Sequence, residues 1–403
     1  MSFIKRTLDN IRPHVSKGAK HEKWYAFFEA VDTFFYSPPD VNKGITHVRD
    51  GIDLKRIMIY VWLAAMPCVI MGCINVGMQA NEALQSLSIT EIQGWRGQIL
   101  SLFDIQIDPN SLWSNFWHGF WYWFPIYVVT FVVGIAWEIL FCTIRGHEVN
   151  EGFFVTSILF SLIVPPSIPL WQVAVGISFG VVLGKEVFGG TGMNFLNPAL
   201  TARAFLYFAY PAQLSGDAVW IAVDGYTSAT ALSVAAADGM EGLAAAGFTL
   251  KETMFGSIPG SIGETSLIAI GIGACFLLYT KVASWRIMLG VLLGMIATAM
   301  LFNAIDSETN PMFNLPWYWH LSIGGFAFGM VYMATDPVSA SMTDLGRFYY
   351  GLLIGVMTVL IRVVNPAFPE GIMLAILFAN LFAPLIDWAV VQSNTRRREK
   401  RYV

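Results

Sequence analysis

Residues 57–78 read IMIYVWLAAMPCVIMGCINVGM and contain no charged side chain. A helix needs about 20 apolar residues to cross the hydrocarbon core of a bilayer, so this stretch predicts a transmembrane helix. The composition agrees, because the 403-residue chain is 55% apolar and 13% charged, whereas soluble domains carry about 25% charged residues. The sequence therefore predicts an integral membrane protein. Residues 1–50 hold no short apolar core with a cleavage site, so we expect no cleavable signal peptide.

The same kind of apolar run recurs along the chain and predicts an all-α fold with about ten transmembrane helices. Several of these helices are broken, at Pro165-Pro166, Gly189-Gly190 and Asn197-Pro198. Broken helices are tolerated at membrane depth where they are buried in protein or line a cavity. The aromatic stretch 112–122 is expected to lie at the interface and to lead into the second span. The predicted spans are 57–78, 123–143, 152–166, 168–184, 195–210, 265–282, 286–304, 319–335, 349–364 and 371–391.

The distribution of Lys and Arg sets the orientation of these spans. With the N-terminus in the cytoplasm, all but four of the 24 Lys and Arg residues fall on the cytoplasmic side, as the positive-inside rule requires. The exceptions are Arg96, Arg203, Lys251 and Arg362. We therefore expect an even number of spans, with both termini in the cytoplasm.

Five spans precede the longest hydrophilic gap and five follow it. Two five-span halves in series have opposite topology, which is the pattern of an inverted repeat. Asn197-Pro198-Ala199 and Asn365-Pro366-Ala367 stand at equivalent places in the two halves. The predicted organisation is a partly amphipathic cytoplasmic segment 1–56, a first membrane repeat 57–210, a periplasmic loop 211–264, a second membrane repeat 265–391 and a basic cytoplasmic tail 392–403.

Carboxylates inside membrane spans are costly and indicate function. Glu138 lies deep in the second span, Asp336 ends the eighth and Asp387 lies late in the tenth. Hard oxygen ligands of this kind suit a hard cation. The alternatives are a structural hydrogen bond between helices for Glu138 and a helix-end turn before Pro337 for Asp336. Arg203 and Arg362 are candidate partners for these carboxylates, because a buried charge needs one.

The four cysteines, Cys68, Cys73, Cys142 and Cys275, lie in or at the ends of apolar segments without CxxC spacing. They predict core residues rather than a disulfide or a metal cluster within this chain. The chain also lacks a G-x-G-x-x-G turn that opens a strand–helix unit, so we expect it to hold no dinucleotide site.

Several long motifs resemble one family. They are GHEVNEGFFVTS at 146–157, GKEVFGGTGMNFLNPA at 184–199, DGYTSATAL at 224–232, MATDPVS at 333–339 and RVVNPA at 362–367. Together they resemble the B subunit of the Na⁺-translocating NADH:quinone oxidoreductase, over nearly the whole chain. The related D subunit of the Rnf complex is similar in its membrane part. The long basic N-terminal segment favours the first of these two, because the resemblance implies that an Rnf-type chain lacks it.

The resemblance implies two flavins. In this family FMN is esterified through its phosphate to the last threonine of a motif like Thr227–Thr230, so Thr230 is the expected acceptor, with Asp224 and Ser228 beside it. Ser228 stands where the family often has Gly, which leaves Thr227, Ser228 and Ser233 as alternative hydroxyls. Noncovalent riboflavin is expected at Asn194 and Asn197, whose side chains both donate and accept hydrogen bonds. The alternative is that these two residues cap the fifth span.

Ubiquinone is the expected electron acceptor, near the cytoplasmic face. Candidate quinone residues are Glu151, Phe153 and Phe154, with the aromatic segments 24–28 and 34–36. Aromatic walls suit a quinone ring, and a carboxylate supplies a proton or a hydrogen bond. The alternative for the N-terminal segment is an amphipathic helix on the membrane surface.

The resemblance thus implies a component of a redox-driven sodium pump in the bacterial inner membrane, which passes electrons from FMN through riboflavin to ubiquinone and exports Na⁺. It also implies that the carboxylates Glu138, Asp336 and Asp387 lie on the Na⁺ path. NADH oxidation is expected on another subunit, electrons are expected from a second FMN-bearing periplasmic subunit, and an exported transferase is expected to attach the FMN. No nucleic-acid partner is expected. A flavin-free channel or permease with inverted repeats is the rival class, and a plain membrane anchor is the third.

Overall fold

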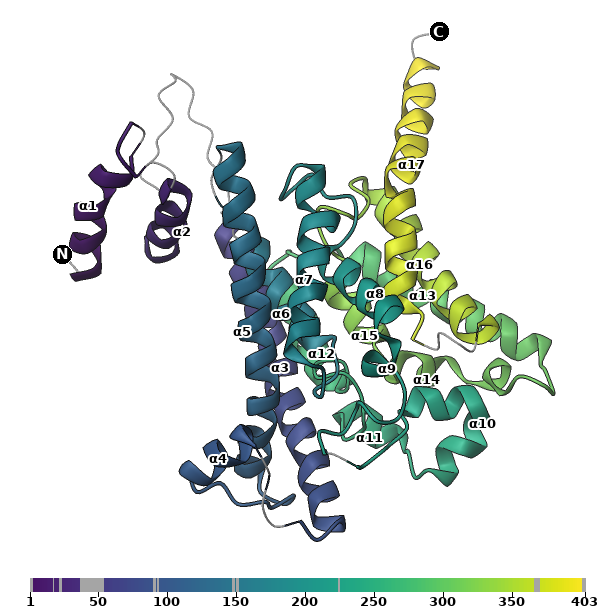
Figure 1. Ribbon diagram of the computed structural model, residues 1–403. Coiled ribbons are helices and arrows are strands. Elements are labelled where there is room, and N and C mark those ends of the chain that lie inside the picture. Colours follow the sequence, from purple (N-terminus) through teal and green to yellow (C-terminus); the bar gives the residue numbers. More distant parts are fainter. Residues whose placement is uncertain are drawn as a thin grey trace.

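The computed structural model describes residues 3–16, 18–21, 24–36, 54–89, 92, 94–146, 149, 152–223, 225–365 and 370–400. Helices α1 to α17, with short 3-10 and π turns, make up the regular structure of these residues, and they contain no strand. The predicted all-α class is therefore confirmed. Figure 1 shows long helices packed side by side, with shorter helices at the lower end of the bundle and a separate pair, α1 and α2, at the upper left.

Six helices among the described residues are long and apolar enough to cross a membrane by length and composition. They include α3 (Leu54–Ser86), α5 (Leu112–Arg145), α13 (Trp285–Ile305), α16 (Asp344–Val364) and α17 (Ile372–Glu399). The sixth begins with α7 (Leu170–Gly184) and continues into the 3-10 turn η2 (Glu186–Phe188). These findings support a multi-pass membrane protein, while the inverted repeat and the topology stay predictions.

The other four predicted spans coincide with shorter or broken helices. They are α6 (Gly152–Leu162), α8 (Pro198–Ala209), α12 (Leu267–Tyr279) and a run of three pieces, α14 (Trp317–Ser322), α15 (Phe326–Phe328) and the π-helix η4 (Gly329–Met333). The chain breaks after α6 at Pro165-Pro166 and between α14 and α15 at Gly324 and Gly325, where Gly324 has φ +67°. Both breaks lie inside the packed protein, where other groups can satisfy the freed backbone.

The aromatic stretch 112–122 leads directly into the second span, as predicted, while its place at the membrane interface stays a prediction. It forms the first turns of α5, because Ser111 caps the helix through its side chain and the next strong stop is Gly146 in the left-handed region.

The asparagines of the two Asn-Pro-Ala motifs differ in local structure. Asn197 caps the start of α8 as its motif suggested, whereas Asn365 ends α16 and α17 starts only at Ile372. Residues 366 and 367 of the second motif lie outside the described residues, so the equivalence of the motifs stays a prediction.

Helices α13 and α16 cross through glycines on both sides. A Cβ at Gly355 would stand 2.1 Å from the Val291 carbonyl oxygen, and one at Gly294 would stand 2.5 Å from the Leu352 carbonyl oxygen. Small residues spaced by four let helix backbones approach closely in a membrane. This reciprocal contact joins α13 to α16 over most of their length.

We predict that Gly355→Val destabilises the protein by roughly 1–3 kcal/mol, because the new side chain overpacks the α13–α16 contact. Gly271→Val on α12 is the matched control, since no atom of another helix lies within 4 Å of a Cβ there. Thermal unfolding of the purified protein in detergent measures both variants. Equal melting temperatures for the two would contradict the prediction.

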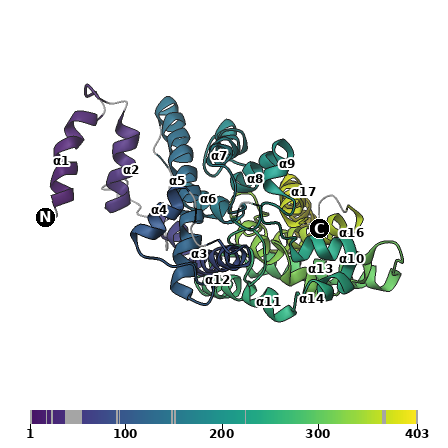
Figure 2. The same cartoon turned by 60° about the horizontal axis from the view of Figure 1, so that its bottom comes forward.

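The short helices lie at two ends of the bundle. Helices α1 (Phe3–Val15) and α2 (Tyr25–Phe35) form a hairpin closed by Leu8, Val15 and Phe28 and by the Arg12–Asp32 ion pair at 2.5 Å. α2 contacts α5. Helices α4 (Trp95–Leu102), α10 (Ala231–Ala245) and α11 (Leu250–Phe255) lie at the other end, away from the basic end of α17 (Figure 1). Figure 2, turned so that this end comes forward, shows the α1–α2 hairpin at one edge of the bundle.

Candidate functional site

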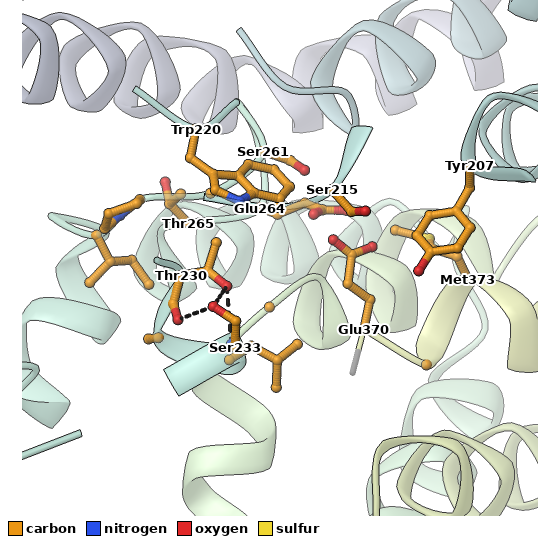
Figure 3. A pocket seen from close by; sticks show the side chains of 18 of the residues that line it. Tyr207, Ser215, Trp220, Thr230, Ser233, Ser261, Glu264, Thr265, Glu370 and Met373 are labelled. Atoms are coloured by element: carbon orange, nitrogen blue, oxygen red, sulfur yellow. Dashed lines mark hydrogen bonds between the residues drawn. The ribbon is translucent and has the colours of Figure 1, made fainter. Parts of the chain in front are cut away.

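A cavity of about 250 Å³ lies beside Thr230 (Figure 3). Its walls come from both halves of the chain: α8, the loop after α9 (Pro211–Leu214), the first turn of α10, the loop 258–265, Gly324, and the start of α17. Trp220 and Tyr207 supply aromatic wall, and Ile258 and Met373 supply apolar wall. The cavity thus combines aromatic, apolar and charged surfaces, as ligand sites commonly do.

Thr230 caps the N-terminus of α10. Its hydroxyl oxygen accepts a hydrogen bond from the Ser233 amide at 3.1 Å, and the hydroxyl donates to the Ser233 hydroxyl at 3.1 Å. The first backbone bond of the helix runs from the Val234 amide to the Thr230 carbonyl. The amides of Ala231 and Leu232 come before that bond, so the helix itself gives them no carbonyl partner. Both residues line the cavity, so this helix end is suited to a phosphate group.

The alternative acceptor hydroxyls occupy different positions. Thr227 is exposed, and the Ser228 amide donates to the Asp217 carbonyl at 2.8 Å, which fixes the loop. Thr230 and Ser233 line the cavity, whereas Thr227 and Ser228 do not belong to its wall. Asp224 lies outside the described residues. The geometry therefore favours Thr230 or Ser233 over the other two hydroxyls.

Three charged side chains meet on the opposite wall. Arg203 of α8 donates to Glu264 at 2.8 Å and forms a second ion pair with Glu370. The side chains of Arg203 and Glu264 are 4% and 5% exposed, whereas that of Glu370 is 30% exposed. One guanidinium therefore faces two carboxylates, and the group has one net negative charge when both are ionised.

This pairing corrects the expectation that Arg203 and Arg362 neutralise the intramembrane carboxylates. Arg362 instead donates to the carbonyl oxygens of His320 and Ile323, at 2.7 and 3.0 Å. Glu264 and Glu370 were not predicted, because both lie outside the predicted spans. The signal available in the sequence was Arg203 itself, a cation on a predicted span with no acidic residue near it in the chain.

Glu138 has a different partner. It forms a buried ion pair with Lys185, which follows α7, and the two side chains are 2% and 4% exposed. The next residue, Glu186, accepts from Arg145 at 3.0 Å. Two carboxylates and two cations therefore alternate where α5 meets η2.

A second cavity, of about 100 Å³, lies among α3, α6, α8 and the end of η4. Lys185, Asn194, Asn197, Tyr332 and Asp336 contribute to its wall. The structure thus brings the two predicted riboflavin residues together with one predicted Na⁺ residue. Lys185 joins this cavity to Glu138.

The two asparagines also have local structural roles. The Asn197 side-chain oxygen accepts from the amides of Ala199 and Leu200, at 3.0 and 3.3 Å, and so caps α8. The Asn194 side-chain amide donates to the Leu196 carbonyl at 2.9 Å. The capping alternative is therefore present for Asn197 but not for Asn194, and both residues lie on the cavity wall.

Asp336 and Asp387 both accept hydrogen bonds from loops. Asp336 accepts from the Val338 amide and the Ser339 hydroxyl, at 3.1 and 2.8 Å, which is the predicted turn before Pro337. Asp387 accepts from the hydroxyls of Ser341 and Thr343, both at 2.6 Å, and from the amides of residues 342 and 343. No group of three or more His, Cys, Asp or Glu side chains that could hold a metal occurs among the described residues.

The quinone candidates lie around the start of α6. Phe153 is fully buried, with its ring against Gly134, and Phe154 is half-buried, with its ring centroid 5.4 Å from that of Phe131. Glu151 lies outside the described residues. In the N-terminal hairpin, Trp24 and Phe27 are exposed.

The family model described as the NQR2, RnfD, RnfE family matches residues 41–396. The chain belongs to this family. Its similar members include proteins named as the B subunit of Na(+)-translocating NADH-quinone reductase from Chromohalobacter salexigens, Stutzerimonas stutzeri and Pseudomonas aeruginosa, at 65%, 63% and 61% identity. Each alignment covers 99% of this chain, and 96%, 100% and 99% of the relatives in the same order. The resemblance to the B subunit family is confirmed.

Proposed function

We propose that this chain is the membrane-embedded B subunit of a redox-driven sodium pump. It passes electrons from FMN on Thr230 through riboflavin to ubiquinone, and this transfer is coupled to Na⁺ export. The names of the 61–65% identical relatives support the pump and its quinone. The observation that carries the flavin part is that the Thr230 hydroxyl caps α10 on the wall of a cavity.

The residues around Thr230 fit a flavin mononucleotide. The Ala231 and Leu232 amides at the start of α10 suit its phosphate, and Trp220 with Tyr207 suits its aromatic rings. Bound there, FMN supplies a one- and two-electron carrier. The chain's own part is to hold the phosphate end and to shield the ring from water.

The second cavity is the proposed riboflavin site. Asn194 and Asn197 offer amide groups, and Lys185 offers a cation.

We predict that Asn197→Ser retains the fold, because a serine oxygen also caps α8. We expect the same variant to lose riboflavin, because serine lacks the side-chain amide donor. The flavin released on denaturation of the purified complex measures this loss. Full retention of released riboflavin would remove Asn197 from the site.

The proposed Na⁺ path uses Glu138, Asp336 and Asp387, and the proposed quinone site uses Glu151, Phe153 and Phe154. Of the three carboxylates on the Na⁺ path, Asp336 stands on the wall of the riboflavin cavity. Asp336 is therefore the carboxylate on which a change in the charge of the flavin would act most strongly. The exposed aromatic side chains of Trp24 and Phe27 suit either a quinone or the membrane surface.

The proposed setting is the bacterial inner membrane, with both termini in the cytoplasm and residues 211–264 in the periplasm. The basic end of α17 and the α1–α2 hairpin lie on the side away from α10 (Figure 1), which supports opposite faces for the quinone and FMN sites. The proposed partners are an NADH-oxidising subunit, a second FMN-bearing periplasmic subunit and an exported flavin transferase.

Flavin fluorescence of the purified chain in a denaturing gel tests this function against its rivals. A covalent flavin gives a fluorescent band at the mass of the chain, and a flavin-free permease gives none. An Rnf-type D subunit would also fluoresce. Na⁺-dependent quinone reduction driven by NADH in membranes separates that chain from the one proposed.

A further inference from the structure

The charged triad of Arg203, Glu264 and Glu370 shares the FMN cavity with Thr230 (Figure 3). Nothing in the proposed electron path uses these side chains. Their charge is unbalanced, because a single guanidinium faces two carboxylates. An electron that enters a buried cavity beside an excess negative charge is opposed by repulsion in a medium of low dielectric constant.

Glu264 is held rigidly where two broken spans meet. Its loop is bound to the end of α6 by the Gly263 amide, which donates to the Leu162 carbonyl at 2.8 Å. The carboxylate packs on the break between α14 and α15, since a Cβ at Gly325 would stand 2.6 Å from one of its oxygens. Glu264 therefore cannot move away from charge that enters the cavity.

The groups facing Glu264 come from several elements. Arg203 faces it from α8, Arg362 from α16 and Glu370 from just before α17, while Tyr207 and the exposed Asp217 line the same cavity. Glu264 lies in a loop outside the spanning helices, and burial, with repulsion from Glu370, raises its pKa to about 7. A carboxylate of this kind changes protonation within the physiological range.

We infer that Glu264 takes up a proton from solvent when the FMN on Thr230 is reduced, and so compensates the negative charge that enters the cavity. This inference rests on the proposed function. The electron comes from the flavin of the partner subunit, and the proton forms an O–H bond at the Glu264 carboxylate. Glu370, which is partly exposed, shares Arg203 with Glu264 and lines the same cavity.

The pH dependence of the midpoint potential of the covalent flavin tests the inference. In the wild type, reduction raises the affinity of Glu264 for a proton, so the potential falls with rising pH more steeply above about pH 7 than below it. Spectroelectrochemical titration of the whole complex measures this profile. Glu264→Gln keeps the shape of the side chain without the titration, and its profile should lose the steeper part.

Glu370→Gln is the matched control, because it neutralises the more exposed of the two carboxylates that pair with Arg203. Its profile should retain the steeper part, which should begin at a lower pH because the repulsion between the two carboxylates is gone. A Glu264→Gln profile that superimposes on the wild type would overturn the inference while the covalent flavin remains. A wild-type chain without covalent flavin would instead overturn the proposed function.

Infrared difference spectra of the unmodified complex decide the question if Glu264→Gln fails to assemble. Above pH 7, reduction of the covalent flavin should add a band from a protonated carboxyl group. Its absence overturns the inference.

Discussion

Thr230→Val should yield a chain that assembles and carries no fluorescent band in a denaturing gel. Valine has nearly the shape of threonine but lacks the hydroxyl that a phosphoester needs. The loss of the helix cap costs about 1 kcal/mol, which a chain of this size tolerates. Without covalent FMN the electron path is interrupted at its start, so we expect quinone reduction by the complex to fall at least tenfold.

The neighbouring hydroxyls provide the matched controls. Thr227→Val and Ser228→Ala should keep full fluorescence, because neither side chain belongs to the cavity wall. Ser233→Ala removes a hydroxyl that does face the cavity and should also keep the band, because the Ser233 amide still binds Thr230. Fluorescence that survives Thr230→Val and disappears in Ser233→Ala would move the attachment site to Ser233.

The second large effect is expected at the buried Glu138–Lys185 ion pair. Lys185→Met leaves an unpaired carboxylate among side chains that are almost fully buried, and breaking such a pair costs about 3–5 kcal/mol. Denaturant or thermal unfolding of the purified protein in detergent measures the loss. Glu138→Gln should cost a similar amount, because it leaves the ammonium unpaired.

The double variant Glu138→Gln with Lys185→Met tests whether stability depends on the ion pair or on the other contacts of each side chain. Removing both charges should recover most of the stability that either single change loses, since an uncharged pair of similar volume is often neutral. Additive losses in the double variant would show that each residue stabilises the protein through other contacts. Lys185→Arg is the matched control, because it keeps the charge and should retain most of the stability.

Helix positions are easier to predict from this sequence than the side chains that meet between helices. Each of the ten predicted spans contains a helix, because long apolar runs determine helices locally. The break between α14 and α15 was not expected, since the apolar run 319–335 continues through Gly324 and Gly325. The stretch 112–122 joins α5 because no residue there stops a helix.

Some residues of the candidate sites could likewise be predicted from the sequence, and others could not. The motif around Thr230 and the pair Asn194 and Asn197 could be located from the sequence, and each lies on the wall of a cavity. The partners of the buried charges could not, because Arg203 and Glu370 are 167 positions apart and only the packing of α8 against α17 brings them together.

The wall of the proposed FMN cavity is drawn from segments as far apart as Arg203 and Leu374. During synthesis, a chain interrupted ahead of α17 therefore has its acceptor threonine but an incomplete cavity around it. Completion of the proposed FMN site therefore requires the insertion of the last helix, and a chain truncated before α17 would leave that side of the cavity open. The structure therefore implies an order of assembly, in which the cavity is completed only after α17 packs against the earlier helices.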